Sequence, residues 1–90
     1  MPAIRLYITG LVQGVFFRAG AEKKAAELGV NGWIKNTADG GVEAQAEGPR
    51  KAINDFADWC KKGPEGSRVD GVNFNDVSEE GCSGFQVRRD

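Results

Sequence analysis

The stretch that most constrains the fold is residues 10–18, Gly-Leu-Val-Gln-Gly-Val-Phe-Phe-Arg, because the hydrophobic period changes across it. Apolar and polar residues alternate before it, from residue 3 to residue 9, which predicts a half-buried strand. After it, residues 17–28 repeat apolar side chains every three to four positions, which predicts a helix that ends at Gly29. The chain is therefore expected to pass from strand to helix through a glycine-containing loop.

A loop of this kind can bind an anion. Gly10 and Gly14 can adopt positive φ angles without steric cost, so several backbone N–H groups can face one point. The N-terminus of the following helix adds partial positive charge, and Arg18 adds a planar pair of donors suited to phosphate or carboxylate. The alternative is an ordinary turn with a solvated arginine, and the pattern of residues alone leaves both interpretations open.

The remaining chain predicts four more strands and one more helix. The sequence Ala-Asp-Gly-Gly at residues 38–41 is typical of a tight hairpin. Strands are expected over residues 30–37, 42–47, within 69–77 and at 85–87, and a second helix from Pro49 to Lys62. We expect Val72 and Phe74 to anchor the strand within 69–77.

The two faces of residues 42–47 differ in chemistry. Val42, Ala44 and Ala46 form a small apolar face on which helices can pack closely. Glu43, Gln45 and Glu47 form a polar face, which we expect to meet solvent.

This order of elements predicts an α+β fold. The predicted order is strand, helix, strand, strand, helix and strand, followed by a short C-terminal strand. This βαββαβ order plus one strand is typical of a ferredoxin-like sandwich. One mainly antiparallel sheet should carry two helices on one face. A length of 90 residues predicts a single domain over residues 1–90.

Composition narrows the function. With 12 basic and 13 acidic residues, the net charge of −1 gives no reason to expect a nucleic-acid or membrane partner. The absence of histidine removes a histidine base and most zinc sites. Cys60 and Cys82 are expected to be reduced thiols, and no apolar leader is apparent, so we expect a cytoplasmic protein that acts as a monomer.

Two motifs resemble those of the acylphosphatase family. Residues 10–18 are similar to its first motif, and residues 32–43, Gly-Trp-Ile-Lys-Asn-Thr-Ala-Asp-Gly-Gly-Val-Glu, are similar to its second. The resemblance implies the ferredoxin-like fold and hydrolysis of small acyl phosphates to a carboxylate and inorganic phosphate. It also implies that phosphate inhibits the enzyme and that no metal or cofactor takes part.

The resemblance also implies residue roles. By position in the motifs, Arg18 would bind the phosphate and Asn36 would orient the attacking water. The residues expected to bind substrate are Gln13, Gly14, Val15, Phe16, Phe17 and Arg18. Without the resemblance, Asn36 would be interpreted as an asparagine that caps the turn at Asp39-Gly40.

Parts of the sequence are also compatible with other functions. A non-catalytic module that binds phosphate or acyl phosphate would share the same loop. The spacing of Cys82 and Arg88 fits the Cys-x5-Arg loop of cysteine-dependent phosphatases, but that loop must lead into a helix, and residues 85–87 predict a strand. An RNA-binding role would need basic and aromatic residues on an exposed sheet face, which the sequence does not predict.

Overall fold

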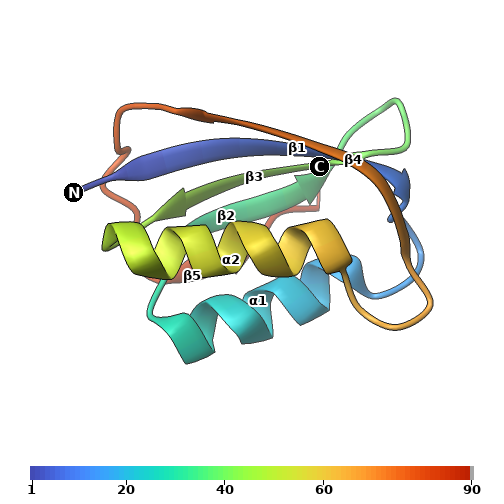
Figure 1. The fold of residues 1–90 in the computed structure, drawn as a ribbon, viewed down its shortest axis with the longest axis horizontal. Helices are drawn as coiled ribbons and strands as arrows, with labels where there is room; N and C mark the ends of the chain where they lie inside the picture. The colour runs from blue at the N-terminus through green and yellow to red at the C-terminus, as the bar shows by residue number, and fades with distance from the viewer. Residues whose placement is uncertain (90) are drawn as a thin grey trace.

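The computed structural model describes residues 1–89 and confirms a mixed sheet with both helices on one face (Figure 1). The elements are β1 (Ala3–Leu11), α1 (Phe17–Leu28), β2 (Asn31–Asn36), β3 (Val42–Glu47), α2 (Arg50–Lys62), β4 (Arg68–Asp76) and β5 (Phe85–Val87). The sheet has the order β4-β1-β3-β2-β5, in which β5 is parallel to β2 and the other neighbours are antiparallel. This is the predicted α+β, ferredoxin-like topology with a short extra strand.

Strand β1 lies between β3 and β4 and delivers the chain to the loop at residues 12–16. Its alternating residues Ile4, Leu6 and Ile8 are buried towards the helices. The strand continues two residues beyond its predicted end, because a register shift between Thr9 and Gly10 keeps it paired with β4. That shift aims the end of β1 at the N-terminus of α1.

Both helices bury one apolar stripe against the sheet. Helix α1 buries Phe17, Ala21 and Ala25, and α2 buries Ile53, Phe56, Ala57 and Cys60. Ala44 and Ala46 on β3 are fully buried beneath them, as their small size predicts. Neither helix is long and apolar enough to cross a membrane.

Close packing between the helices explains a glycine in the interior of α1. A Cβ at Gly20 would lie 3.1 Å from the Trp59 ring on α2, so the missing side chain makes room for the indole. Trp59 also packs against Phe17, with ring centroids 5.4 Å apart. The N-terminal turn of α1 is thereby held against α2.

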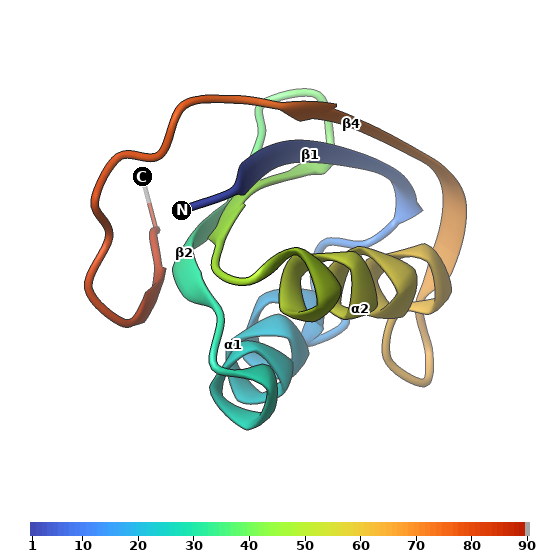
Figure 2. The same ribbon diagram turned by 60° about the vertical axis from the view of Figure 1, so that its left-hand side comes forward.

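The prediction that the polar face of β3 meets solvent is wrong for two of its residues. Gln45 is 0% exposed and Glu47 is 2% exposed. The segment after β4 passes around the sheet on the side away from the helices (Figure 2), and its backbone N–H groups at Glu80 and Cys82 donate to the Glu47 carboxylate at 2.6 and 3.0 Å. Gln45 Nε2 donates to the same carboxylate at 2.9 Å. The burial of this charged group is tolerated because both of its oxygens accept hydrogen bonds, Oε2 from Glu80 N–H and Gln45 and Oε1 from Cys82 N–H.

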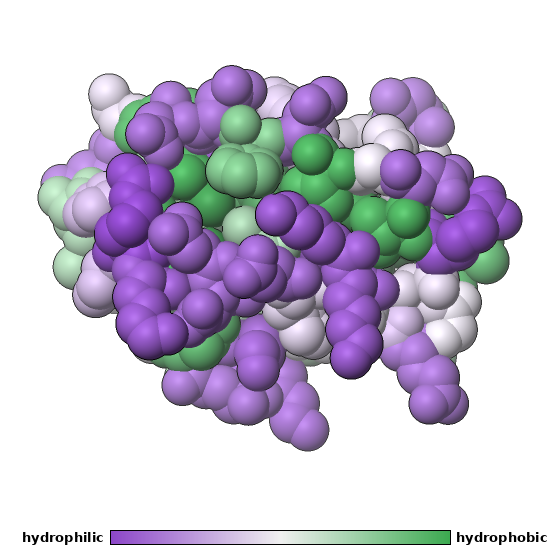
Figure 3. Space-filling model, in the orientation of Figure 1, coloured by the Kyte–Doolittle hydropathy of each residue, from purple (hydrophilic) through white to green (hydrophobic). Residues whose placement is uncertain are grey.

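Phe74 was also predicted wrongly as an anchor of its strand. Its side chain is 46% exposed, whereas Val72 is half-buried. Strand β4 is an edge strand, and Figure 3 shows apolar side chains uncovered above α2 on a face that is otherwise largely hydrophilic. The Lys61 ammonium lies 5.5 Å from the centre of the Phe74 ring, at the rim of the helix layer.

Candidate active site

The loop between β1 and α1 adopts the conformation expected of an anion-binding nest. Gly14 has φ 73° and Phe16 has φ 62°, while Val15 between them has no positive φ. Residues that alternate between left-handed and ordinary backbone turn successive N–H groups towards one point. Phe16 is the N-cap of α1 and makes no side-chain cap hydrogen bond, and the first turn holds no acidic residue. The positive end of this helix is therefore open to an anion.

Phe16 stands out because it is bulky and left-handed. Among residues 1–89 it is the only residue other than glycine with positive φ, and its side chain is 84% exposed. Such a conformation costs about 1–2 kcal/mol for a residue with a Cβ, and no burial of the ring offsets it. Strain of this kind is often found where the backbone geometry itself has a function.

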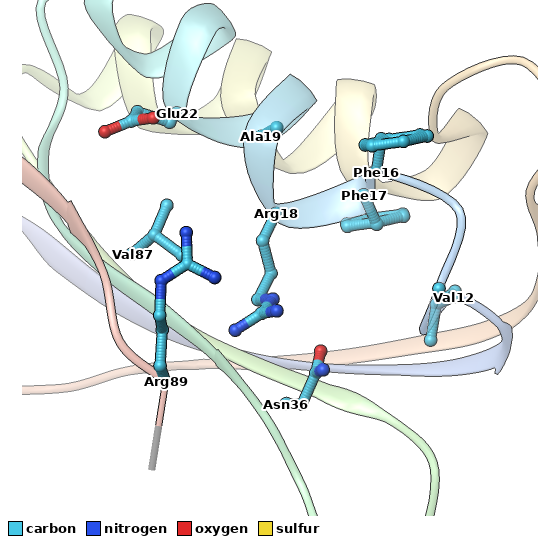
Figure 4. A pocket seen from close by; sticks show the side chains of 10 residues that line it. Val12, Phe16, Phe17, Arg18, Ala19, Glu22, Asn36, Val87 and Arg89 are labelled. Carbon is cyan, nitrogen blue, oxygen red and sulfur yellow. The ribbon is translucent and has the colours of Figure 1, made fainter.

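Arg18 extends from the first turn of α1 across the pocket towards Asn36 (Figure 4). One guanidinium nitrogen donates to the Arg88 carbonyl oxygen at 2.9 Å. Within residues 1–89, no carboxylate lies within salt-bridge distance of this side chain. The guanidinium is thus oriented by a neutral acceptor and keeps its charge for a ligand.

Asn36 is the last residue of β2 and lies on the same face as Ile34, towards the helices. Its Oδ1 atom is buried and has no hydrogen-bond partner within the described part of the chain. Buried acceptors without a donor are rare and cost free energy. In this structure the oxygen is also closed to water, so it can accept a hydrogen bond from the ligand or from water only after a side chain beside it moves.

The turn after Asn36 is capped by other residues. The Thr37 hydroxyl donates to the Asp39 carboxylate, and Gly41 N–H donates to both side chains at 3.1 and 3.3 Å. The hydrogen bond from Thr37, with a further one from Gly41 N–H, holds the pKa of Asp39 below its ordinary value. The turn-capping role that the sequence left open for Asn36 is filled by Thr37 and Asp39.

A pocket of about 640 Å³ brings most of the expected site residues together. Of the residues named from sequence, it is lined by Gly14, Phe16, Phe17, Arg18 and Asn36. Gln13 and Val15 do not line it: Gln13 bonds to the hairpin after β2, and Val15 packs against the core.

The remaining wall of the pocket was not predicted. It is formed by Val12, Ala19, Glu22, Val87 and Arg89. Glu22 is four positions beyond Arg18 on α1, so helical spacing could have suggested it. Nothing local in the sequence indicates that Val87 and Arg89 at the end of the chain reach this pocket.

The cysteine-phosphatase alternative does not fit. Cys82 is followed by strand β5 and not by a helix, and the Arg88 guanidinium stacks 4.4 Å from the centre of the Trp33 ring. Burial, with the charges of Glu47 and Glu80, raises the pKa of the Cys82 thiol. A nucleophilic cysteine needs the opposite shift. No disulfide joins Cys60 and Cys82 in the structure.

Comparisons with known proteins agree with this geometry. The model of the family described as acylphosphatase matches residues 4–87. An acylphosphatase of Synechococcus sp. (strain RCC307) is 46% identical over 84 residues, covering 93% of this chain and 72% of its own. The crystal structure of an acylphosphatase from Bacillus subtilis superposes with a TM-score of 0.94 at 36% identity, covering 98% of this chain and 99% of its own. The structure of an acylphosphatase from Coxiella burnetii superposes with a TM-score of 0.93 at 41% identity. The match covers 97% of this chain and 92% of that one.

The fold and the comparisons thus define a ferredoxin-like hydrolase. The chain belongs to the acylphosphatase family. It is an enzyme whose substrate is an acyl phosphate and whose product is phosphate.

Proposed function

We propose that the phosphoryl group of a small acyl phosphate binds to the loop of residues 13–18 and to Arg18, while Asn36 orients the attacking water. An acyl phosphate is a mixed anhydride of a carboxylic acid and phosphoric acid. Water forms a new bond to phosphorus, the bond from phosphorus to the carboxyl oxygen breaks, and the pair of electrons leaves on the carboxylate. The protons of the water remain on the phosphate product, which exchanges them with solvent. Since a carboxylate is a good leaving group, the protein needs mainly to balance phosphoryl charge and place the water.

Charge balance is the task of the nest and Arg18. The N–H groups of the loop and of the first turn of α1 suit the equatorial phosphoryl oxygens, as does the guanidinium fork. Arg18 is already oriented by the Arg88 carbonyl, so little reorganisation is needed when the substrate arrives. Charge spread over three oxygens in the transition state gains most from such fixed donors.

The observation that carries the proposal is the buried, unpartnered Oδ1 of Asn36 in the pocket that Arg18 also lines. An amide oxygen can accept a hydrogen bond from water and so direct the lone pair of that water towards phosphorus. Asn36 carries no charge, so it would add little to the affinity for phosphate. The two residues would therefore divide binding and water placement between them.

The test uses purified protein, benzoyl phosphate as substrate and inorganic phosphate as inhibitor. Arg18→Lys should lower kcat/KM and weaken competitive inhibition by phosphate, because an ammonium cannot reproduce the bidentate fork. Arg68→Lys is the matched control, since Arg68 is exposed and bonds only to Asp70. Parental turnover and phosphate affinity in Arg18→Lys would contradict the assignment. A complete lack of turnover by the parent would favour the binding-module alternative.

Further parts of the proposal concern the whole chain. We infer that residues 1–90 form one domain, because a single cluster of buried side chains draws on both helices and on β1, β2 and β3, with β4 and β5 packed at its edge. We also propose that the enzyme acts as a cytoplasmic monomer on small molecules and without a nucleic-acid partner, metal or cofactor. The fold does not depend on a disulfide between Cys60 and Cys82, which is compatible with a reducing compartment.

A further inference from the structure

The side chain of Gln13 connects the two halves of the proposed site. Its Nε2 donates two hydrogen bonds, to the carbonyl oxygens of Thr37 and Gly41, and both are 2.8 Å long. These acceptors lie at the two ends of the hairpin between β2 and β3. Gly41 O also accepts from Thr37 N–H at 2.9 Å, so the amide closes onto the first rung of that hairpin.

The hydrogen bonds of Gln13 join two segments that lie next to the proposed site. Gln13 begins the anion-binding loop, directly before Gly14. Thr37 directly follows Asn36, whose Oδ1 is the buried acceptor in the pocket. The distance between the phosphate-binding loop and the water-orienting amide is therefore spanned by one side chain and two hydrogen bonds.

No other side chain within the described loop, residues 12–16, makes a hydrogen bond. The loop is anchored by packing through Val12 and Val15 and by its covalent ends in β1 and α1. Apolar packing is not directional, whereas two hydrogen bonds from one planar amide fix both distance and angle. Gln13 is the element that can set the register of the loop against the hairpin.

We propose that Gln13 is a positioning residue that holds Asn36 in line with the phosphoryl group bound by the loop. The inference rests on the roles proposed above for the loop and for Asn36. In-line attack on phosphorus requires the water, the phosphorus and the leaving oxygen to be collinear, and a misplacement of about 1 Å can slow such a step about 100-fold. Both donors of the Gln13 amide are consumed by the hairpin, so its side chain supports the reaction through Asn36 and does not bind substrate itself.

A double-mutant cycle tests the proposal. Gln13→Met keeps the length of the side chain and removes both donors, and Gln86→Met is the matched control because Gln86 is exposed on β5. Turnover of benzoyl phosphate, inhibition by inorganic phosphate and melting temperature are measured for Gln13→Met, Asn36→Ala and the double variant. We expect Gln13→Met to lower kcat about 10- to 100-fold while the inhibition constant of phosphate changes by less than about 3-fold. In the Asn36→Ala background the same change should lower kcat by less than about 2-fold, because no oriented water remains to be misplaced.

Two results would overturn the inference. Equal losses of kcat in both backgrounds would show that Gln13 acts independently of Asn36, and parental kcat per folded molecule would show no positioning role. If Gln13→Met does not fold, Gln13→Glu provides the readout. Protonation restores one donor to the glutamate, so its kcat relative to the parent should rise as the pH falls, and a flat ratio would overturn the inference.

The proposed function and this inference fail in different ways. Parental turnover in Asn36→Ala would contradict the water-orienting role itself. A large loss of kcat in Asn36→Ala together with parental turnover in Gln13→Met would contradict only the role given to Gln13.

Discussion

The Arg18 guanidinium donates a 2.9 Å hydrogen bond to the main-chain carbonyl oxygen of Arg88, which lies 70 positions later in the chain. Arg88 is itself fixed on β2, because its N–H donates to the Ile34 carbonyl oxygen at 2.8 Å. Asn36 stands two residues beyond Ile34 on the same strand. One strand therefore holds both the amide that would orient water and, through Arg88, the guanidinium that would bind phosphate.

This relationship predicts a difference between two substitutions at one position. Arg88→Ala keeps the main chain and should leave kcat/KM within about 2-fold of the parent, since the Arg88 guanidinium only stacks on Trp33. Arg88→Pro removes the N–H that bonds to Ile34 and should release the carbonyl from Arg18, lowering kcat/KM about 10-fold or more. Initial rates with benzoyl phosphate decide between them. Equal kcat/KM values for the two variants would contradict a positioning role for this carbonyl.

A second prediction concerns the strain at Phe16. Asparagine tolerates the left-handed conformation, so Phe16→Asn should raise the free energy of unfolding by about 1 kcal/mol, because little burial of the exposed ring is lost. Urea unfolding measures this change. The adjacent Phe17 is 1% exposed, and Phe17→Asn should instead destabilise the protein by about 3–5 kcal/mol. A destabilised Phe16→Asn would mean that the ring makes stabilising contacts in solution.

A third prediction concerns Glu47 and pH. Burial alone would raise the pKa of this carboxyl, but the hydrogen bonds from Glu80 N–H, Gln45 and Cys82 outweigh burial and hold it below the ordinary value of 4.5. The folded state therefore gains stability from Glu47 above that value and loses it as the pH falls through the lowered pKa. At pH 7, Glu47→Gln should lower the free energy of unfolding by about 1–3 kcal/mol. The NH2 group that replaces one carboxylate oxygen would face a backbone N–H, and two donors cannot form a hydrogen bond.

Urea unfolding at pH 7 and at pH 3 would test this prediction. The difference between parent and Glu47→Gln should be smaller at the lower pH, because below the ordinary value of 4.5 the unfolded state takes up the proton and the stabilisation by the charged carboxyl declines. Glu65→Gln is the control, because Glu65 is exposed in the turn before β4. A difference that stays constant with pH would show that the charge of Glu47 is not what holds the segment after β4.

A fourth prediction is that chelators leave turnover unchanged. In the proposed mechanism, phosphoryl charge is met by the guanidinium of Arg18 and by backbone N–H groups, and the pocket lining formed by residues 1–89 holds one carboxylate, that of Glu22. One group of side chains in the described residues could hold a metal ion, and it consists of Glu47, Glu80 and Cys82. This group lies on the opposite side of the sheet from the pocket. Rates of benzoyl phosphate hydrolysis before and after EDTA should agree within about 2-fold. Loss of activity that a divalent ion restores would contradict the mechanism.

Local pattern predicted the elements around the site well. Helix α1 begins and ends at the predicted residues, because its apolar spacing begins at Phe17 and Gly29 closes it in a left-handed conformation. Strand β3 also has its predicted bounds. The hairpin after Asn36 was predicted from the sequence Asp39-Gly40, whose conformational preferences act over a few residues.

The failures on the polar face of β3 and at the site are long-range. Alternation indicates only that Gln45 and Glu47 share a face, and whether a distant segment covers that face depends on donors more than 30 positions away, at Glu80 and Cys82. The roles of Arg88 and of the Gln13 side chain depend on contacts across 70 and 24 positions. Such contacts are made by the finished fold and leave no local signal in the sequence.

The most direct test of the central claim is the turnover of Asn36→Ala per folded molecule, measured together with its inhibition by inorganic phosphate. An oriented water predicts that kcat falls at least about 100-fold while the inhibition constant of phosphate changes by less than about 3-fold, because only the placement of the nucleophile is lost. The free energy of unfolding should not fall, since the substitution removes a buried amide oxygen that has no partner in the described residues, and Thr37 and Asp39 cap the turn. A kcat equal to that of the parent, with or without a loss of stability, would contradict the account.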